Sequence, residues 1–167
     1  VYGDWIVYPL WVIIGLFSAF SAVNIGHDAI HGAYAKQSKI NGLMSHSFNL
    51  LGASAYMWKV MHNQAHHTFT NIDHHDEDII AVPIIRMASN QLWKPIHRYQ
   101  HIFCWFLYPL GTLSWVFKKD YSKFYQKSIG TFPLKHKAKD HVMLYVYKGI
   151  YYFLFIALPL MMVDVPI

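Results

Sequence analysis

The sequence predicts an all-α, polytopic integral membrane domain with interfacial amphipathic helices that carry histidine-rich motifs. Hydrophobic residues make up 54% and aromatic residues 17% of the 167 residues, whereas charged residues make up only 14%. This is the composition of a membrane protein whose polar residues gather in a few loops. Two histidine clusters lie directly beside apolar stretches. We expect one partial domain over residues 1–167, with N- and C-terminal parts missing, because the chain starts at Val1 rather than Met and stops just after an apolar run.

The first apolar stretch, Trp5 to Gly26, contains no charged residue. About 20 apolar residues suffice to cross the hydrocarbon core of a bilayer, so this stretch predicts one spanning helix. Tyr8 and Trp11 lie near its start, as aromatic side chains do at a headgroup interface. The alternative, a buried helix of a soluble protein, is disfavoured by the length of the uncharged stretch. The first histidine cluster, Gly26 to Gly32, should therefore emerge at one membrane surface.

Residues Ile40 to Trp58, between the two clusters, predict an amphipathic helix that lies in the membrane interface or re-enters it shallowly. Apolar residues recur there at spacings of three or four, which places them on one stripe of a helix. This apolar stripe consists of Ile40, Leu43, Met44, Phe48, Leu51, Ala55 and Trp58. A second, polar stripe consists of Asn41, Ser45, Asn49 and Gly52. Such a helix returns the chain to the same membrane side, so that both clusters can contribute to one site.

The later part of the chain contains two further apolar stretches. Ile102 to Phe117 is uncharged but short, and Pro109-Leu110-Gly111 is expected to break it, so that it either spans the membrane or re-enters and returns. Val142 to Val163 is expected to span, with Lys148 extending its amine to the interface. Seven of the 14 cationic side chains fall between Lys118 and Lys139. A basic loop beside apolar segments typically sets the membrane topology of the chain or contacts anionic lipid headgroups. It does not indicate a nucleic-acid partner.

The spacing of the histidines predicts a metal site. His27 and His31 are four residues apart, which on a helix places both rings on one face, and His62 and His66 repeat that spacing. His67 adds a third ring to the second cluster. Imidazole is a common ligand of iron, zinc and copper. Five histidines without a cysteine partner exceed what one tetrahedral zinc ion needs, which favours two metal ions, and iron with open positions would bind dioxygen and attack unactivated C–H bonds.

Other polar residues are expected to support these ligands. Asp28 lies beside the first cluster and can orient a ring by accepting its second N–H. Asp76, Glu77 and Asp78 follow the second cluster, and one of them is expected to contact a cluster histidine or an acyl headgroup, with a solvated acidic run as the alternative; Asp76 and Asp78 are the expected supporting residues. His101 is a supplementary ligand or ligand contact, or else makes an interfacial hydrogen bond. Further supporting positions are Asn63 and Asn71.

These motifs together resemble the membrane fatty acid desaturases, most closely their acyl-lipid and acyl-CoA branch, which includes the front-end enzymes. The residues that carry the resemblance are His27-Asp28-x-x-His31, then His62-Asn63-x-x-His66-His67-x-x-Thr70-Asn71, then Asp76 and Asp78-Ile79. Trp58, four residues before the second cluster, also looks like that family. The family's third histidine box, His or Gln followed two residues later by His-His, does not occur in this sequence and is expected beyond Ile167. This fragment alone should therefore be inactive.

The resemblance implies a centre of two non-haem iron ions that uses dioxygen to insert a cis double bond into an acyl chain. The implied metal ligands are the five cluster histidines, and no further catalytic residue is implied. The acyl chain would be carried on CoA, a carrier protein or a lipid, and electrons would come from a ferredoxin or a b-type cytochrome. The implied location is an integral membrane protein of the bacterial inner membrane or the endoplasmic reticulum, with the site on the cytosolic face.

Two alternative functions stay open from the sequence. A hydroxylase of the same superfamily would start with the same hydrogen abstraction and form an alcohol instead. A membrane metal-binding or transport protein would place its ligands inside spanning helices, facing each other across a bundle. The histidine clusters lie at the ends of apolar runs, which counts against transport.

Overall fold

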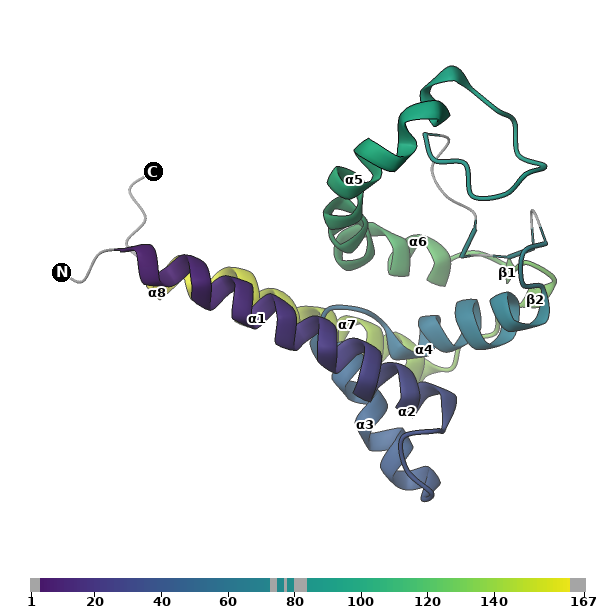
Figure 1. The fold of residues 1–167 in the computed structure, drawn as a ribbon. Coiled ribbons are helices and arrows are strands. Elements are labelled where there is room, and N and C mark those ends of the chain that lie inside the picture. Colours follow the sequence, from purple (N-terminus) through teal and green to yellow (C-terminus); the bar gives the residue numbers. More distant parts are fainter. Residues whose placement is uncertain (1–3, 73–74, 77, 80–83, 163–167) are drawn as a thin grey trace. The chain divides into compact units, whose positions relative to one another are not determined.

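The computed structural model describes residues 4–72, 75–76, 78–79 and 84–162, and most of them are helical (Figure 1). This confirms the predicted helical class, to which the described residues add one two-stranded hairpin. The chain forms two compact units. One contains the described residues up to Ala55 and those from Val146 onward, and the other runs from Tyr56 to Tyr145. Each unit is described by itself.

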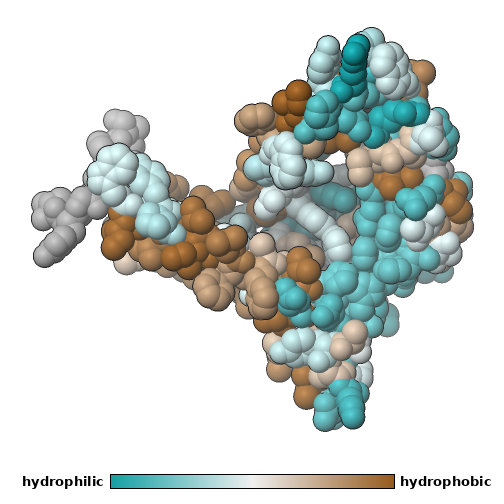
Figure 2. Space-filling view, viewed as in Figure 1, coloured by the Kyte–Doolittle hydropathy of each residue, from teal (hydrophilic) through white to brown (hydrophobic). Residues whose placement is uncertain are grey.

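The first unit begins with a long helix, here called the first histidine helix. A 3₁₀ turn (Asp4–Ile6) leads into α1 (Val7–Ser21), a π-helical segment (Ala22–His27) and α2 (Asp28–His31). The 25 residues Val7–His31 are long and apolar enough to cross a membrane, and apolar side chains cover α1 (Figure 2). The helix extends past the predicted end of the span at Gly26. The first histidine cluster therefore lies on the helix itself.

Helix α3 (Ser38–Leu50) packs against the last turns of the first histidine helix. Burial does not follow the two predicted stripes: Asn41 and Asn49 of the polar stripe are buried together with Phe48 of the apolar stripe, and this differs from Ile40 and Leu43, which are exposed. The amide of Asn41 explains part of the difference: its Oδ1 accepts the N–H of Ala35 at 2.8 Å and its Nδ2 donates to the carbonyl of Gly32 at 2.9 Å. A buried side-chain amide is tolerated when its donors and acceptors are used in this way.

The prediction of a single helix over residues 40–58 is wrong, because α3 ends at Leu50 and the chain turns there. Gly52 has φ +88°, a left-handed value that a side chain disfavours, and the next helix starts where Asn49 Oδ1 accepts the N–H of Ala55 at 2.8 Å. Lys148 Nζ donates to the Gly52 carbonyl at 2.7 Å, and this lysine is only 3% exposed. Lys148 therefore does not extend to the interface as predicted. Its charge lies near the C-terminal end of α3, where helix carbonyls lack intrahelical donors.

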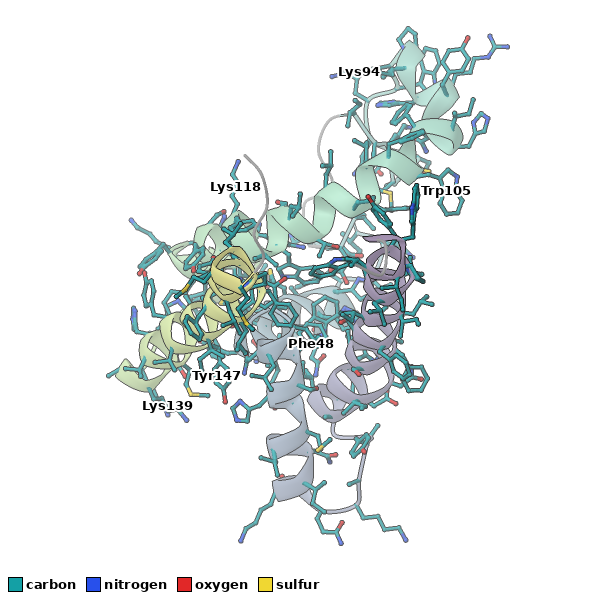
Figure 3. All side chains as sticks on the ribbon, turned by 90° about the vertical axis from the view of Figure 1, so that its left-hand side faces the viewer. Phe48, Lys94, Trp105, Lys118, Lys139 and Tyr147 are labelled. Carbon is teal, nitrogen blue, oxygen red and sulfur yellow. The ribbon has the colours of Figure 1, made fainter. Side chains whose placement is uncertain are left out.

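The second long helix consists of α7 (Ala138–Tyr152), a π-helical segment (Phe153–Ala157) and α8 (Leu158–Met162). Together these 25 residues are also long and apolar enough to cross a membrane. The predicted span, Val142 to Val163, falls within this helix except for Val163, which lies outside the described residues. In the first unit the ring of Tyr147 (labelled in Figure 3) stacks on His46 of α3 with centroids 5.4 Å apart.

The second unit begins with what is here called the second histidine helix: α4 (Ala55–Trp58), continued by a π-helical segment (Lys59–His66). Among its described residues, the other helical segments are a 3₁₀ turn (Pro95–Tyr99), α5 (Gln100–Ser114), a π-helical segment (Trp115–Lys119), α6 (Asp120–Phe124) and the start of α7 as far as Tyr145. The predicted break at Pro109-Leu110-Gly111 is wrong, because α5 continues through Pro109. One missing N–H bends or weakens a helix, but the flanking turns can continue it.

A short hairpin and α6 cover one side of the second histidine helix. Strands β1 (Ser128–Ile129) and β2 (Phe132–Pro133) pair antiparallel, with Ile129 opposite Phe132. The core between them and the helix contains Met57, Val60, Met61, Ala65, Phe124, Ile129 and Leu144. Met57, Met61 and Ala65 are four residues apart and at most 1% exposed, so one row of this helix is fully packed. The neighbouring row consists of Trp58, His62 and His66.

Close packing around Gly26 leads to the first testable prediction. A Cβ added there would lie 2.6 Å from Phe48 Cδ2 and 3.1 Å from Ser47 Oγ. Gly26→Ala should therefore lower the free energy of unfolding by about 1–3 kcal/mol. The matched control is Gly15→Ala on the same helix, where no atom lies within 4 Å of the added Cβ and where alanine should stabilise the helix by about 0.5–1 kcal/mol. Thermal unfolding in detergent measures both changes, and equal shifts for the two variants would contradict the prediction.

Candidate metal centre

The second histidine helix places two imidazoles one above the other. His62 and His66 lie in its π-helical segment, a form that occurs frequently at functional sites. Their rings stack with centroids 5.0 Å apart and planes 15° apart. The indole of Trp58, one turn before His62, stacks on the His62 ring, with the two centroids 4.6 Å apart. The indole thus covers the first imidazole of the pair.

A reversal of the chain brings two carboxylates back to these histidines. The Thr70 hydroxyl donates to the carbonyl of His66 at 2.8 Å, and Asn71 adopts a left-handed backbone with φ 63°. Asparagine is among the few side chains that enter this region readily. The Asn71 N–H then donates to Asp76 Oδ2 at 2.7 Å. Asn71, which the sequence suggested as a supporting residue, contacts the site through its backbone.

Asp76 and Asp78 each bind one histidine. Asp76 Oδ1 accepts from His66 Nδ1 at 2.8 Å and from the N–H of Asp78 at 2.9 Å, and Asp76 is fully buried. Asp78 Oδ2 lies 2.7 Å from His62 Nδ1 and 3.7 Å from His66 Nδ1. The expected contact between the acidic residues and the cluster histidines is therefore present, and the alternative of a purely solvated run is wrong for Asp76.

The electrostatics favour a charged Asp76 and a neutral His62. Burial acts to raise the pKa of Asp76, but the hydrogen bonds from the His66 ring and from the N–H groups of Asn71 and Asp78 outweigh it, so the pKa lies below its ordinary value. Burial lowers the pKa of His62, against the opposing hydrogen bond and charge of Asp78. Neutral imidazole is the form that binds a metal ion.

This arrangement suits a metal centre. A Nδ1–H that donates to a carboxylate fixes the tautomer and leaves Nε2 as the nitrogen with the lone pair, which is the common geometry of metal-binding histidines. Ligand atoms of His62, His66 and Asp78 all lie within 4.8 Å of one another. Nitrogen and carboxylate donors of this kind suit iron or zinc. At 2.7 Å from His62 Nδ1, Asp78 has the distance of a hydrogen-bond acceptor that orients the ring.

His67, the third predicted ligand of this cluster, is exposed at the end of the helix. Its ring lies edge-on to both others, with centroids 4.8 Å from His62 and 5.4 Å from His66. Asn63 follows His62 on the helix and is half-buried. His101 is exposed on α5, and among the described residues of its unit no hydrogen bond joins it to this cluster. Its predicted role stays a prediction.

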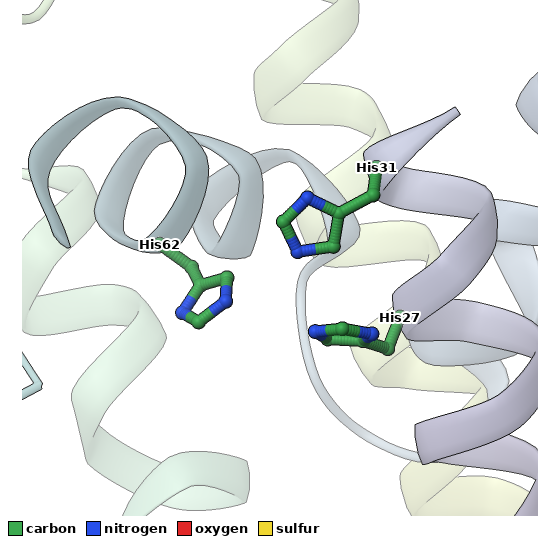
Figure 4. A group of neighbouring side chains, drawn as sticks. All are labelled: His27, His31 and His62. Atoms are coloured by element: carbon green, nitrogen blue, oxygen red, sulfur yellow. The ribbon is translucent and has the colours of Figure 1, made fainter. Parts of the chain in front are cut away.

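The first histidine cluster lies in the other unit and repeats part of this pattern. His27 and His31 project from the same side of their helix (Figure 4), with ring centroids 4.4 Å apart. Asp28 Oδ1 lies 3.1 Å from His27 Nδ1, as expected from the sequence, although both side chains are more than a third exposed. Gly32 then ends the helix with φ 76°. Figure 4 also draws His62 on its own helix.

The contact between Trp58 and His62 was not predicted from the sequence. The sequence placed this residue on the apolar stripe of an interfacial helix, and the resemblance to a family was the only other reason to name it. The available signal was its position four residues before His62, which puts the two side chains one turn apart on any continuous helix.

Comparisons with known proteins identify the family of the chain. The family model of fatty acid desaturases matches residues 3–167. The chain is 38% identical over 104 residues to a sn-1 linoleoyl-lipid 6-desaturase of Arthrospira platensis, which is 62% of this chain and 28% of that protein. It is also 38% identical over 130 residues, 77% of this chain and 26% of the relative, to an acyl-lipid (8-3)-desaturase of Physcomitrium patens. The chain thus spans roughly a quarter of the length of these relatives. No solved structure matches.

Proposed function

Because the chain belongs to the fatty acid desaturase family, we propose that the protein of which it is part inserts a cis double bond into a fatty acyl chain with dioxygen as co-substrate. The observation that carries this proposal is the pair of carboxylate–histidine contacts, His62 with Asp78 and His66 with Asp76. They fix two imidazoles for metal binding beside a helix row that is fully packed. A desaturase needs such a fixed centre, because an alkyl chain offers no polar group by which a flexible site could grip it.

We propose that the metal ligands of this chain are the five cluster histidines, His27, His31, His62, His66 and His67, and that they hold two iron ions. The family is known for iron-dependent catalysis, and the donor set described above fits iron. Iron bound there would supply the activation of dioxygen that removes hydrogen from two neighbouring methylene groups.

The residues of this chain would contribute positioning and electrostatics. Asp76 and Asp78 hold the Nδ1 protons, so that the two rings cannot rotate away or change tautomer. The negative charge of Asp76 would strengthen the His66 ring as an electron-pair donor to a metal ion. Trp58 covers the face of His62 and keeps water from it. Asp28 would play the same role for His27 in a more exposed setting. We assign supporting roles of this kind also to Asn63, Asn71 and His101.

The relatives are named for acyl-lipid substrates, so we propose that the acyl chain is presented on a membrane lipid, with acyl-CoA and acyl carrier protein as alternatives. The two apolar helices Val7–His31 and Ala138–Met162 would then cross the membrane as part of a polytopic domain. We place the histidines on the cytosolic face of the bacterial inner membrane or the endoplasmic reticulum. Electrons would come from a ferredoxin or a b-type cytochrome.

Fatty acid profiling tests this function. The complete protein is expressed in cells, and total fatty acids are compared with those of cells that carry an empty vector. A new unsaturated fatty acid is expected. A new hydroxylated fatty acid instead would replace desaturase by hydroxylase. An unchanged profile together with stoichiometric metal in the purified, reduced protein would favour a membrane metal-binding protein.

His66→Ala tests the proposed ligand set. The variant should abolish the new fatty acid and lower the iron content, while its amount in the membrane stays unchanged. The matched control is Gln64→Ala, which changes an exposed residue of the same helical segment. Iron measured by mass spectrometry in the purified proteins separates the two variants. If His66→Ala retains the iron of the wild type, His66 leaves the ligand set.

A further inference from the structure

Residues 118–139, here called the lysine-rich cap, carry a concentration of positive charge that the proposed reaction does not use. The lysines are Lys118, Lys119, Lys123, Lys127, Lys135, Lys137 and Lys139. Most of these side chains are exposed, and Lys118 and Lys139 extend away from the ribbon (Figure 3). Half of the 14 cationic side chains thus lie in one short segment. Such a surface attracts an anionic partner.

The cap is a folded part of the second unit. Phe124 and Ile129 are fully buried and pack against the second histidine helix. His136 stacks on Phe124 with centroids 3.8 Å apart, its Nε2 donates to the Phe124 carbonyl at 2.6 Å, and the Tyr56 hydroxyl lies 3.0 Å from its Nδ1. These contacts fix the backbone that carries the lysines relative to His62 and His66.

The two aspartates in and beside the cap are engaged with other groups. Asp120 is fully buried and accepts a hydrogen bond from Trp115 Nε1 at 3.0 Å. Asp140 Oδ2 accepts the backbone N–H of Lys137 at 2.8 Å, at the start of α7. Neither carboxylate is placed to form a negative surface of its own. The outward charge of the cap is therefore strongly positive.

The surroundings of these lysines indicate a bilayer surface. Aromatic side chains lie among them: Phe117 is 52% exposed, Tyr125 is 61% exposed, and the Lys119 amine lies 4.9 Å from the ring of Trp115. The cap leads directly into α7, whose first turn contains Lys139 and which continues into an apolar helix long enough to span. Lysines and aromatic side chains next to a spanning helix are the usual composition of a headgroup contact.

We propose that the lysine-rich cap binds the anionic headgroups of the membrane leaflet it faces, and that it thereby holds the second histidine helix at the membrane surface. The phosphate of an anionic phospholipid complements the lysine amines, and each lysine near such a surface strengthens the attraction about fivefold. The inference rests on the membrane location proposed above and not on desaturation. An acidic protein is the competing partner.

Site-specific quenching tests this inference. In the full-length protein, Gln126→Cys beside Lys127 provides the labelling site, after Cys104 and any cysteine outside residues 1–167 are replaced by serine. A fluorophore at position 126 is read in neutral phosphatidylcholine vesicles doped with either brominated phosphatidylglycerol or brominated phosphatidylcholine. We expect the anionic lipid to quench at least about threefold more strongly at about 0.15 M salt, and the preference to disappear at about 1 M salt, where charges are screened within about 3 Å.

Charge variants supply the controls. Replacing Lys118, Lys127 and Lys135 by glutamine should remove the preference, whereas replacing Lys36, Lys39 and Lys94, exposed lysines outside the cap, should preserve it. His66→Ala should also preserve it, which separates this inference from the proposed reaction. Equal quenching by both lipids would overturn the proposal. So would quenching by neither lipid combined with protection of the fluorophore by an added acidic electron-transfer protein, which would assign the cap to a protein partner.

Discussion

Asp76→Ala should lower the iron affinity of the complete protein by about 10- to 100-fold while the protein still inserts into the membrane. The substitution removes the acceptor of the His66 Nδ1 proton and leaves the N–H groups of Asn71 and Asp78 without their carboxylate. The His66 ring would then be free to turn and to change tautomer. Iron retained after dialysis against a chelator series, measured by mass spectrometry, gives the affinity ratio.

Two further variants make this result specific. Asp76→Asn keeps the shape and an acceptor oxygen but removes the charge, so it should give an intermediate loss of iron. Asp140→Asn changes a carboxylate of the same unit that caps the start of α7, and it should leave the iron content unchanged. If Asp76→Ala and Asp140→Asn bind iron equally well, the carboxylate–histidine contact plays no part in metal binding.

Gly52→Ala should be the most destabilising of the glycine substitutions described. The backbone of Gly52 is left-handed with φ +88°, and an added Cβ would lie 2.8 Å from Cε2 and 2.9 Å from Cζ of Tyr151. The strained backbone and the overpacking together should lower the free energy of unfolding by about 2–4 kcal/mol. Because Gly52 forms the turn between α3 and the second histidine helix, we expect loss of bound iron at temperatures where the wild type retains it.

Thermal unfolding in detergent, with iron content followed in parallel, measures this effect. Gly42→Ala is the matched control, because it lies within α3 and has no atom within 4 Å of an added Cβ. It should stabilise the protein by about 0.5–1 kcal/mol. Combining Gly52→Ala with Tyr151→Leu should recover part of the loss, since it removes the ring but not the backbone strain. If the double variant recovers no stability, the whole destabilisation comes from the left-handed backbone of Gly52 and none from overpacking against Tyr151.

The grouping of the histidines in the second cluster could be predicted from the sequence because it depends on short spacings. His62 and His66 are four residues apart, and any helix brings them onto one face. The return of Asp76 and Asp78 depends on a local reversal at Asn71, which is also encoded within a few residues. The two long apolar helices could also be predicted from the sequence, because their length and their lack of charge define them.

Other features depend on contacts between distant residues, which periodicity cannot reveal. The polar stripe of α3 did not indicate that Asn41 and Asn49 would be buried, and both amides bind the backbone of the adjoining turns. The amine of Lys148 reaches a carbonyl 96 positions away in the sequence. The continuity of α5 through Pro109 is a third case, since a proline and a nearby glycine lower the probability of a helix without forbidding it.

The packing of the second histidine helix also has a consequence for assembly of the holoprotein. Hydrophobic contacts pack Met57, Met61 and Ala65 against Phe124 and Ile129, and these contacts require no metal ion. Formation of this helix would therefore not depend on the free energy of metal binding. Small domains that fold only when metal is bound differ in this respect. The helix and its Asp76 contact should be in place when the chain leaves the translocation machinery, ready to receive iron later and to survive its loss.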